Sequence, residues 1–138
     1  MALVVDASLV AHWLLPDEAA KPGIPTIDGV KGEALFVPAI FWYELRNIFI
    51  VCERRSRLSP EGTSLALSYV QALDISIDFR HDDSLILSLA RAHALTVYDA
   101  AYLELALRKR LPLITLDTKL NAAFLATPAD YCSHADNK

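Results

Sequence analysis

The chain alternates short apolar runs with longer segments in which apolar residues recur every three or four positions. Runs of three or four apolar residues indicate strands, whereas the longer spacing indicates helices that bury one face. Strands and helices in regular alternation are typical of helices packed on a mostly parallel sheet. The pattern therefore predicts an α/β fold.

Four strands and six helices can be placed from this pattern and from its capping residues. The strands are predicted at residues 3–5, 35–37, 75–77 and 113–116. The helices are predicted at residues 7–15, 41–55, 60–73, 83–93, 97–110 and 118–125. Ser59, Asp82 or Asp83, and Thr96 are the expected N-caps of the third, fourth and fifth helices. Several Pro and Gly residues between positions 17 and 33 interrupt any long helix there.

Length and composition favour one domain that does not enter a membrane. The 138 residues are 54% hydrophobic and 22% charged, which suits a single core, and no apolar stretch reaches the ~20 residues of a membrane span. The N-terminus lacks a basic leader and reaches Asp6 after only five residues, so it does not read as a secretory signal. Cys52 and Cys132 are too few for a disulfide framework. We therefore expect a cytoplasmic protein.

Asp6 and Asp117 occupy equivalent places, each after an apolar strand and before a helix. The carboxyl ends of parallel strands form the edge at which open α/β sheets bind ligands. An aspartate at such a position is also an ordinary helix N-cap. The pattern alone leaves both roles open.

Glu44 and Asp99 are carboxylates placed beside the apolar stripes of their helices. Glu44 precedes Leu45 by one residue and Ile48 by four, and Asp99 precedes Tyr102 and Leu103 by three and four. A carboxylate in such a place needs a partner, although Asp99 can also stabilise the start of its helix. The spacing does not settle whether either side chain reaches the edge of the sheet.

Four carboxylates in one pocket would require a counter-charge. Two unit charges about 5 Å apart repel by about 3 kcal/mol at an effective dielectric of about 20. Oxygen ligands without His or Cys favour Mg²⁺ or Mn²⁺, and such a cation can activate water against a phosphodiester. Metal-assisted phosphodiester hydrolysis is therefore the predicted chemistry.

Four segments of the sequence resemble the acidic motifs of PIN-domain ribonucleases, in their order and spacing. The segments are VVDAS at residues 4–8, ELRN at 44–47, TVYDAAYL at 96–103 and LITLD at 113–117. The resemblance is strongest to VapC toxins of VapBC toxin–antitoxin systems. It covers residues 2 to about 125, which predicts a PIN domain at residues 1–125 and a polar C-terminal tail at 126–138.

The resemblance implies a three-layer α/β/α fold with a mostly parallel sheet of four or five short strands. It implies an endoribonuclease whose metal ligands are Asp6, Glu44, Asp99 and Asp117, holding Mg²⁺ or Mn²⁺. Ser8 and Thr115 would lie beside the site, with Arg46 and Asn47 as weaker candidates for support of the ligands. The implied partners are an RNA substrate, a VapB-like antitoxin and a second copy of the chain.

Several features keep other readings open. The net charge of −4 does not suit RNA binding by bulk charge. Two basic clusters, Arg54 to Arg57 and Arg108 to Arg110, can either guide RNA or complement helix dipoles. A catalytically silent PIN-like binding module is the main alternative. A phosphatase with an aspartyl nucleophile fits less well because Ser8 replaces its usual second aspartate, and a receiver domain would need a lysine strand motif that is absent.

Overall fold

In the part of the chain that the structure describes, four parallel strands form the centre of the domain. The computed structural model describes residues 1–128, 130 and 131, so most of the predicted tail, residues 129 and 132–138, lies outside the described residues. The strands are β1 (Ala2–Val5), β2 (Ala34–Pro38), β3 (Ile75–Asp78) and β4 (Leu113–Ile114). They pair in the order β3-β2-β1-β4, and every pairing is parallel. The predicted α/β fold with a mostly parallel sheet is confirmed.

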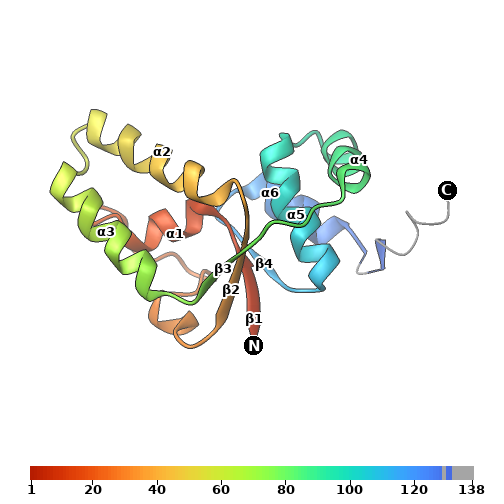
Figure 1. Cartoon of the computed structure of the whole chain (residues 1–138), viewed down its shortest axis with the longest axis horizontal. Coiled ribbons are helices and arrows are strands. Elements are labelled where there is room, and N and C mark those ends of the chain that lie inside the picture. The colour runs from red at the N-terminus through yellow and green to blue at the C-terminus, as the bar shows by residue number, and fades with distance from the viewer. Residues whose placement is uncertain (129, 132–138) are drawn as a thin grey trace.

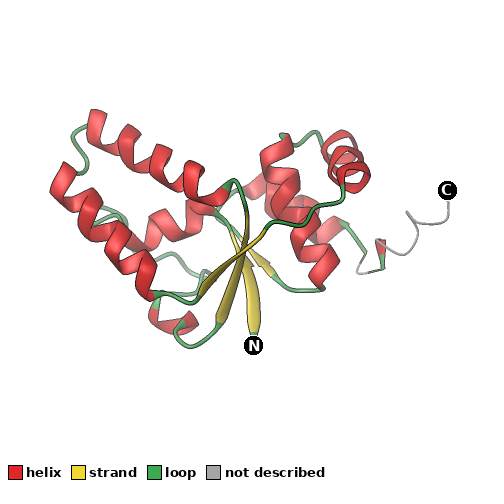
Figure 2. Ribbon diagram, in the orientation of Figure 1, coloured by secondary structure: helices red, strands yellow, loops and turns green. Residues whose placement is uncertain are grey.

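Among the described residues, six α-helices are present. They form a layer on each face of the sheet (Figures 1 and 2). One layer consists of α1 (Ala7–Leu14), α2 (Phe41–Arg54) and α3 (Pro60–Ala72). The other consists of α4 (Asp83–His93), α5 (Val97–Lys109) and α6 (Thr118–Ala126). The architecture is therefore the expected three-layer α/β/α domain.

Side chains from the sheet and from both helical layers form the core. Val4, Val5 and Val37 are completely buried in the sheet, as expected for central strands covered on both faces. On α5 the six consecutive residues from Tyr102 to Leu107 are all buried, because this helix packs against the sheet, α4 and α6 at once. This burial fixes α5, and with it Asp99 in its first turn.

Side-chain caps begin most of the helices at the predicted places. The hydroxyl of Ser59 accepts the Gly62 N–H at 3.0 Å, and the carboxylate of Asp82 accepts the Leu85 N–H at 3.0 Å. Thr96 likewise accepts the N–H of Asp99 at 3.1 Å. Such bonds satisfy N–H groups that lack partners within the helix, so these starts were readable from the local sequence.

Two segments differ from the sequence-based description. The fourth strand was predicted at 113–116, but β4 ends at Ile114, because the hydroxyl of Thr115 accepts the Asp117 N–H at 2.9 Å and the chain turns towards α6. The interrupted segment before β2 contains a short 3-10 turn, Asp28–Val30. The described part of the tail packs on the domain, where the Tyr131 hydroxyl lies 3.2 Å from that of Ser88.

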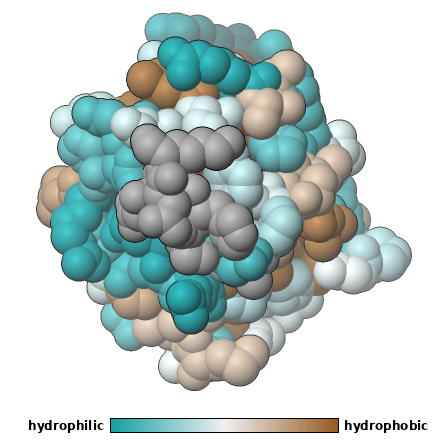
Figure 3. Space-filling view, turned by 90° about the vertical axis from the view of Figure 1, so that its right-hand side faces the viewer, coloured by the Kyte–Doolittle hydropathy of each residue, from teal (hydrophilic) through white to brown (hydrophobic). Residues whose placement is uncertain are grey.

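Within the described residues, no helix is both long enough and apolar enough to cross a membrane. Figure 3 views the molecule from the side on which α4 lies. Hydrophilic residues occupy much of the visible surface, and hydrophobic residues appear there in separate patches.

Candidate active site

The four predicted site carboxylates all lie at the N-termini of helices. Asp6 is the N-cap of α1 and Asp117 the N-cap of α6, whereas Glu44 and Asp99 lie in the first turns of α2 and α5. Helix N-termini carry partial positive charge, which favours carboxylates there. The fold therefore directs four helix N-termini at one end of the sheet, where β1 and β2 end (Figure 1).

Asp6 is the most buried of the four and holds the centre of a hydrogen-bond network. Its side chain follows β1 and is 5% exposed. Oδ1 accepts bonds from the Ser8 hydroxyl at 2.8 Å and the Leu9 N–H at 3.0 Å, and Oδ2 accepts a short bond from the Thr115 hydroxyl. Burial raises the pKa of Asp6, while these donors oppose the rise and the charge of Asp117 adds to it.

Glu44 is half-buried on α2, in the same helical layer as α1, and it faces α5 of the other layer. Its Oε1 accepts a hydrogen bond from the Tyr102 hydroxyl at 2.9 Å, so the N-terminal turns of α2 and α5 meet above the end of the sheet. Burial raises the pKa of Glu44, and the charges of Asp99 and Asp6 raise it further against the Tyr102 bond.

Asp99 and Asp117 complete the arrangement. Burial and the charge of Asp117 raise the pKa of Asp99, while Thr96 and Lys119 act in the opposite direction. Asp117 is more exposed, and its Oδ1 accepts the Leu120 N–H at 2.8 Å. Each acid thus lies within electrostatic range of two others: Asp6 of Glu44 and Asp117, and Asp99 of the same two.

This donor set fits a hard divalent cation in its chemistry. It contains only carboxylate oxygens, and three of the four pKa values are raised, as expected where negative charges crowd without a counter-ion. In the described conformation no three His, Cys, Asp or Glu side chains converge closely enough to hold a metal ion. The acids of this donor set therefore lie within electrostatic range of one another without forming a closed ligand cluster among the described residues.

Arg57 and Arg108, one from each basic cluster singled out in the sequence, form ion pairs away from the site. Arg57 binds Asp17 with two hydrogen bonds, at 2.8 and 3.0 Å, and also contacts Glu18 at 3.1 Å. Arg108 pairs with the buried Glu104 at 2.6 Å. These contacts favour the structural interpretation of both clusters.

The predicted support from Arg46 and Asn47 is not seen in the described residues. The guanidinium of Arg46 lies 5.2 Å from the ring centre of Trp42 and donates to the Trp42 carbonyl at 3.2 Å. Asn47 is exposed on α2. Neither contacts a site carboxylate.

Two residues near the site were not identified from the sequence. Tyr102 was predicted only as part of the apolar stripe of its helix. A buried phenol hydroxyl needs a hydrogen-bond acceptor, so a tyrosine in that stripe was a signal of a polar group nearby. Lys119, in the first turn of α6, influences Asp99 electrostatically. A lysine two residues after an N-cap carries no such signal.

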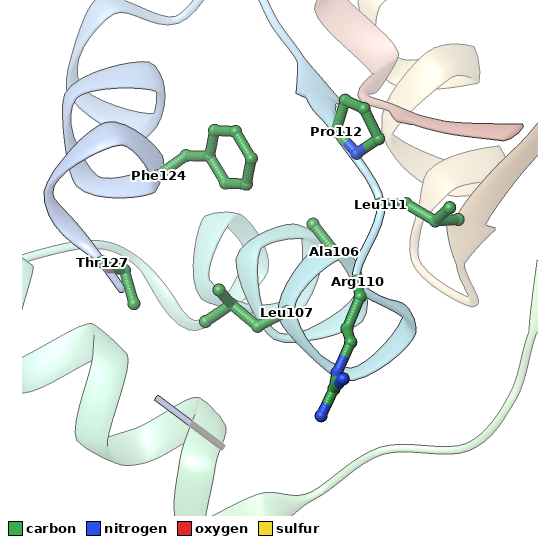
Figure 4. Close-up of a pocket in the computed structure, with 7 residues that line it drawn as sticks. All are labelled: Ala106, Leu107, Arg110, Leu111, Pro112, Phe124 and Thr127. Carbon is green, nitrogen blue, oxygen red and sulfur yellow. The ribbon is translucent and has the colours of Figure 1, made fainter. Parts of the chain in front are cut away.

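A separate cavity of about 440 Å³ lies at the other end of α5 (Figure 4). It is bounded by apolar side chains from α5, α6 and the segment before β4, with Arg110 at its margin. Asp99 and Arg110 are eleven residues apart, or about 16 Å along a helix. Its lining includes no carboxylate, so its chemistry differs from that of the acidic site.

The comparisons with known proteins agree with this geometry. Residues 3–124 match the model of the PIN domain, and the chain therefore belongs to the PIN-domain family. Within that family it is 32% identical to "Ribonuclease VapC3" of Pyrobaculum aerophilum, over 93% of this chain and 100% of that protein. This similarity assigns the chain to the VapC ribonucleases.

A solved structure supports the fold independently. The crystal structure of PAE2754 from Pyrobaculum aerophilum superimposes with a TM-score of 0.64 over 89% of this chain and 87% of that one. Its sequence identity is 24%, so it bears on the fold alone.

Proposed function

We propose that this chain is a divalent-metal-dependent endoribonuclease, the toxin of a type II toxin–antitoxin pair, and that Asp6, Glu44, Asp99 and Asp117 hold Mg²⁺ or Mn²⁺. Membership of the VapC ribonucleases supports the reaction and its RNA substrate. The observation that carries the site is the gathering of four carboxylates at four helix N-termini, each within electrostatic range of two others.

The cation would be held by these four carboxylates, and it would supply an activated water and neutralise charge on the phosphoryl group. Asp6 is pre-positioned for such a role because Ser8, Leu9 and Thr115 fix both of its oxygens. Lys119, whose charge already acts on Asp99, provides a positive group for the approaching RNA phosphate.

The test is RNA cleavage with and without MgCl₂ or MnCl₂, by the wild type and by Asp6→Asn and Asp99→Asn. Asparagine still caps a helix, so Asp6→Asn removes the charge and largely keeps the cap. We expect each substitution to lower cleavage by more than about 100-fold, since the loss of residues that merely support metal ligands costs about 10–100-fold.

Asp82→Asn is a matched control for the capping role. Asp82 caps α4 as Asp6 caps α1, with a bond to the Leu85 N–H, but it is not among the site carboxylates. Cleavage should survive in this variant. Activity that persists in both site variants would contradict the proposed site. If the wild type cleaves none of the RNAs, with or without added metal, the catalytically silent binding module is favoured instead.

We propose further that the chain acts in the cytoplasm, pairs with a VapB-like antitoxin and forms a homodimer. The support is its similarity to a VapC ribonuclease. Light scattering of the purified chain would measure the mass in solution, and a monomer at micromolar concentration would contradict the dimer.

Co-purification with the product of an adjacent gene, and inhibition of cleavage by it, would test the antitoxin.

A further inference from the structure

Tyr102 has an unusual environment for a tyrosine. Tyr102 lies on α5, three residues after Asp99, and only 1% of it is exposed. Its ring is therefore enclosed by the apolar core. A buried phenol hydroxyl has to find an acceptor inside the protein. Here the acceptor is Oε1 of Glu44, 2.9 Å away and on the helix of the opposite layer.

The bond between Tyr102 and Glu44 joins two parts of the chain that are 58 positions apart. Tyr102 belongs to α5 and Glu44 to α2, so the hydroxyl donates its proton from one helical layer to a carboxylate of the other.

Glu44 has three rotatable side-chain bonds, and α2 alone does not determine where its carboxylate lies. The Tyr102 bond fixes one oxygen from across the sheet, and the other oxygen has no hydrogen-bond partner among the described residues. A bond from a rigid, fully packed ring is well suited to select one position of a flexible carboxylate.

We propose that Tyr102 is a positioning residue, which holds one oxygen of Glu44 so that the carboxylate stays beside Asp6 and Asp99 and is available to a divalent cation. This inference rests on the proposed function. Tyr102 itself touches neither the cation nor the RNA, and it acts only through Glu44.

The test is the affinity of the full chain for Mn²⁺, measured by titration calorimetry in protein first stripped of metal. Tyr102→Phe removes one hydroxyl and keeps the ring, and we expect it to weaken Mn²⁺ binding by about 10–100-fold, the usual cost of losing a partner of a metal ligand. Tyr98→Phe is the matched control, because Tyr98 lies one turn earlier on α5 and is 58% exposed. It should bind Mn²⁺ as the wild type does.

A second control separates positioning from folding. Leu105 is buried on the same helix, and Leu105→Val loosens its packing without touching Glu44. If Tyr102 only supported the fold, both variants would lose Mn²⁺ affinity in proportion to their loss of thermal stability. We expect affinity loss in Tyr102→Phe alone.

The outcomes separate the two proposals. A wild type that binds Mn²⁺ and a Tyr102→Phe protein that binds it equally well would overturn the positioning role and leave the metal site standing. A wild type that binds no Mn²⁺ would overturn both.

Discussion

At the scale of single residues, Asp6 shows that an aspartate at the end of a strand can cap a helix and also take part in a candidate site. One oxygen caps α1 through the Leu9 N–H, and the other is bound by the hydroxyl of Thr115, the residue that follows β4. Thr115 in turn accepts the N–H of Asp117. One hydroxyl therefore joins the two strand ends that carry the acids.

Removing that hydroxyl should damage both stability and activity. Thr115→Val keeps the shape of the side chain but leaves Oδ2 of Asp6 and the Asp117 N–H without their partner in a buried place. We expect a loss of about 1–3 kcal/mol in the free energy of unfolding, the usual cost of an unsatisfied buried group, together with reduced cleavage. Urea unfolding measures the first and RNA cleavage the second. Thr115→Ser keeps the hydroxyl and should retain most of both, and a Val variant as stable as the wild type would contradict the role.

The sequence singled out the four acids as candidates, but it did not show how they lie relative to one another. Capping and strand ends are local features, readable at Asp6 and Asp117. That Glu44 lies near Asp99 depends on the way α2 and α5 meet above the sheet, through a contact between residues 58 positions apart. Tyr102 escaped notice for the same reason.

At the scale of elements, α5 is tied to the sheet by a cluster of charges. Asp78 at the end of β3 binds Arg108 at 3.1 Å and Arg80 at 3.2 Å, and it lies 3.5 Å from Lys109. Arg108 also pairs with the buried Glu104 of its own helix. The second basic cluster therefore fastens the end of α5 to β3, on the helix that carries Asp99 at its start.

Asp78→Asn should weaken this attachment in a pH-dependent way. Although burial opposes ionisation, bonds from Arg80 and Arg108 hold the pKa of Asp78 well below its ordinary value. A lowered pKa in the folded state contributes stability above the ordinary aspartate pKa of about 4, and that stability is lost as the pH falls through the folded value. At pH 7 we expect the variant to lose about 1–3 kcal/mol, as for a hydrogen bond to a charged group. The difference from the wild type should shrink below about pH 4, and a constant difference in urea unfolding at all pH values would contradict the assignment.

Element boundaries were predictable where the determining interactions are local, and less so elsewhere. The starts of α3, α4 and α5 follow from Ser59, Asp82 and Thr96, which bond only to their own helices. The length of β4 depends on a long-range contact, because this strand, which pairs with β1 at the edge of the described sheet, ends where the Thr115 hydroxyl bonds to Asp6. The apolar run at residues 113–116 therefore predicted a longer strand than the two residues that β4 contains.

At the scale of the whole molecule, the site carboxylates lie together at one end of the sheet, whereas other carboxylates pair with arginine side chains. The net charge is −4, and cations such as Arg57 and Arg108 are already paired with carboxylates. Among the described residues, hydrogen-bond donors and the charge of Lys119 offset the repulsion between the site acids. A bound divalent cation would relieve that repulsion, so metal binding and folding should be linked.

This linkage predicts metal stabilisation that increases with pH. Burial and mutual repulsion raise the pKa values of Asp6, Glu44 and Asp99. An acid with a raised pKa in the fold holds a proton that the unfolded chain releases. Its contribution to metal-free stability is therefore full below the unfolded pKa of about 4 and is lost as the pH rises through the folded value. Cation binding needs the ionised carboxylates, so it should recover this stability at high pH and compete with protons at low pH.

Thermal melts in EDTA and in MnCl₂ should therefore separate more at pH 8 than at pH 5. At a free metal concentration 100 times the dissociation constant, the stabilisation should be about 2.7 kcal/mol. Asp6→Asn should lose most of the increment, because it removes the most buried charge of the site while retaining a cap, and Asp82→Asn should keep it. Increments that are equal at the two pH values, or that persist in Asp6→Asn, would mean that Mn²⁺ binds at the surface rather than among these four carboxylates.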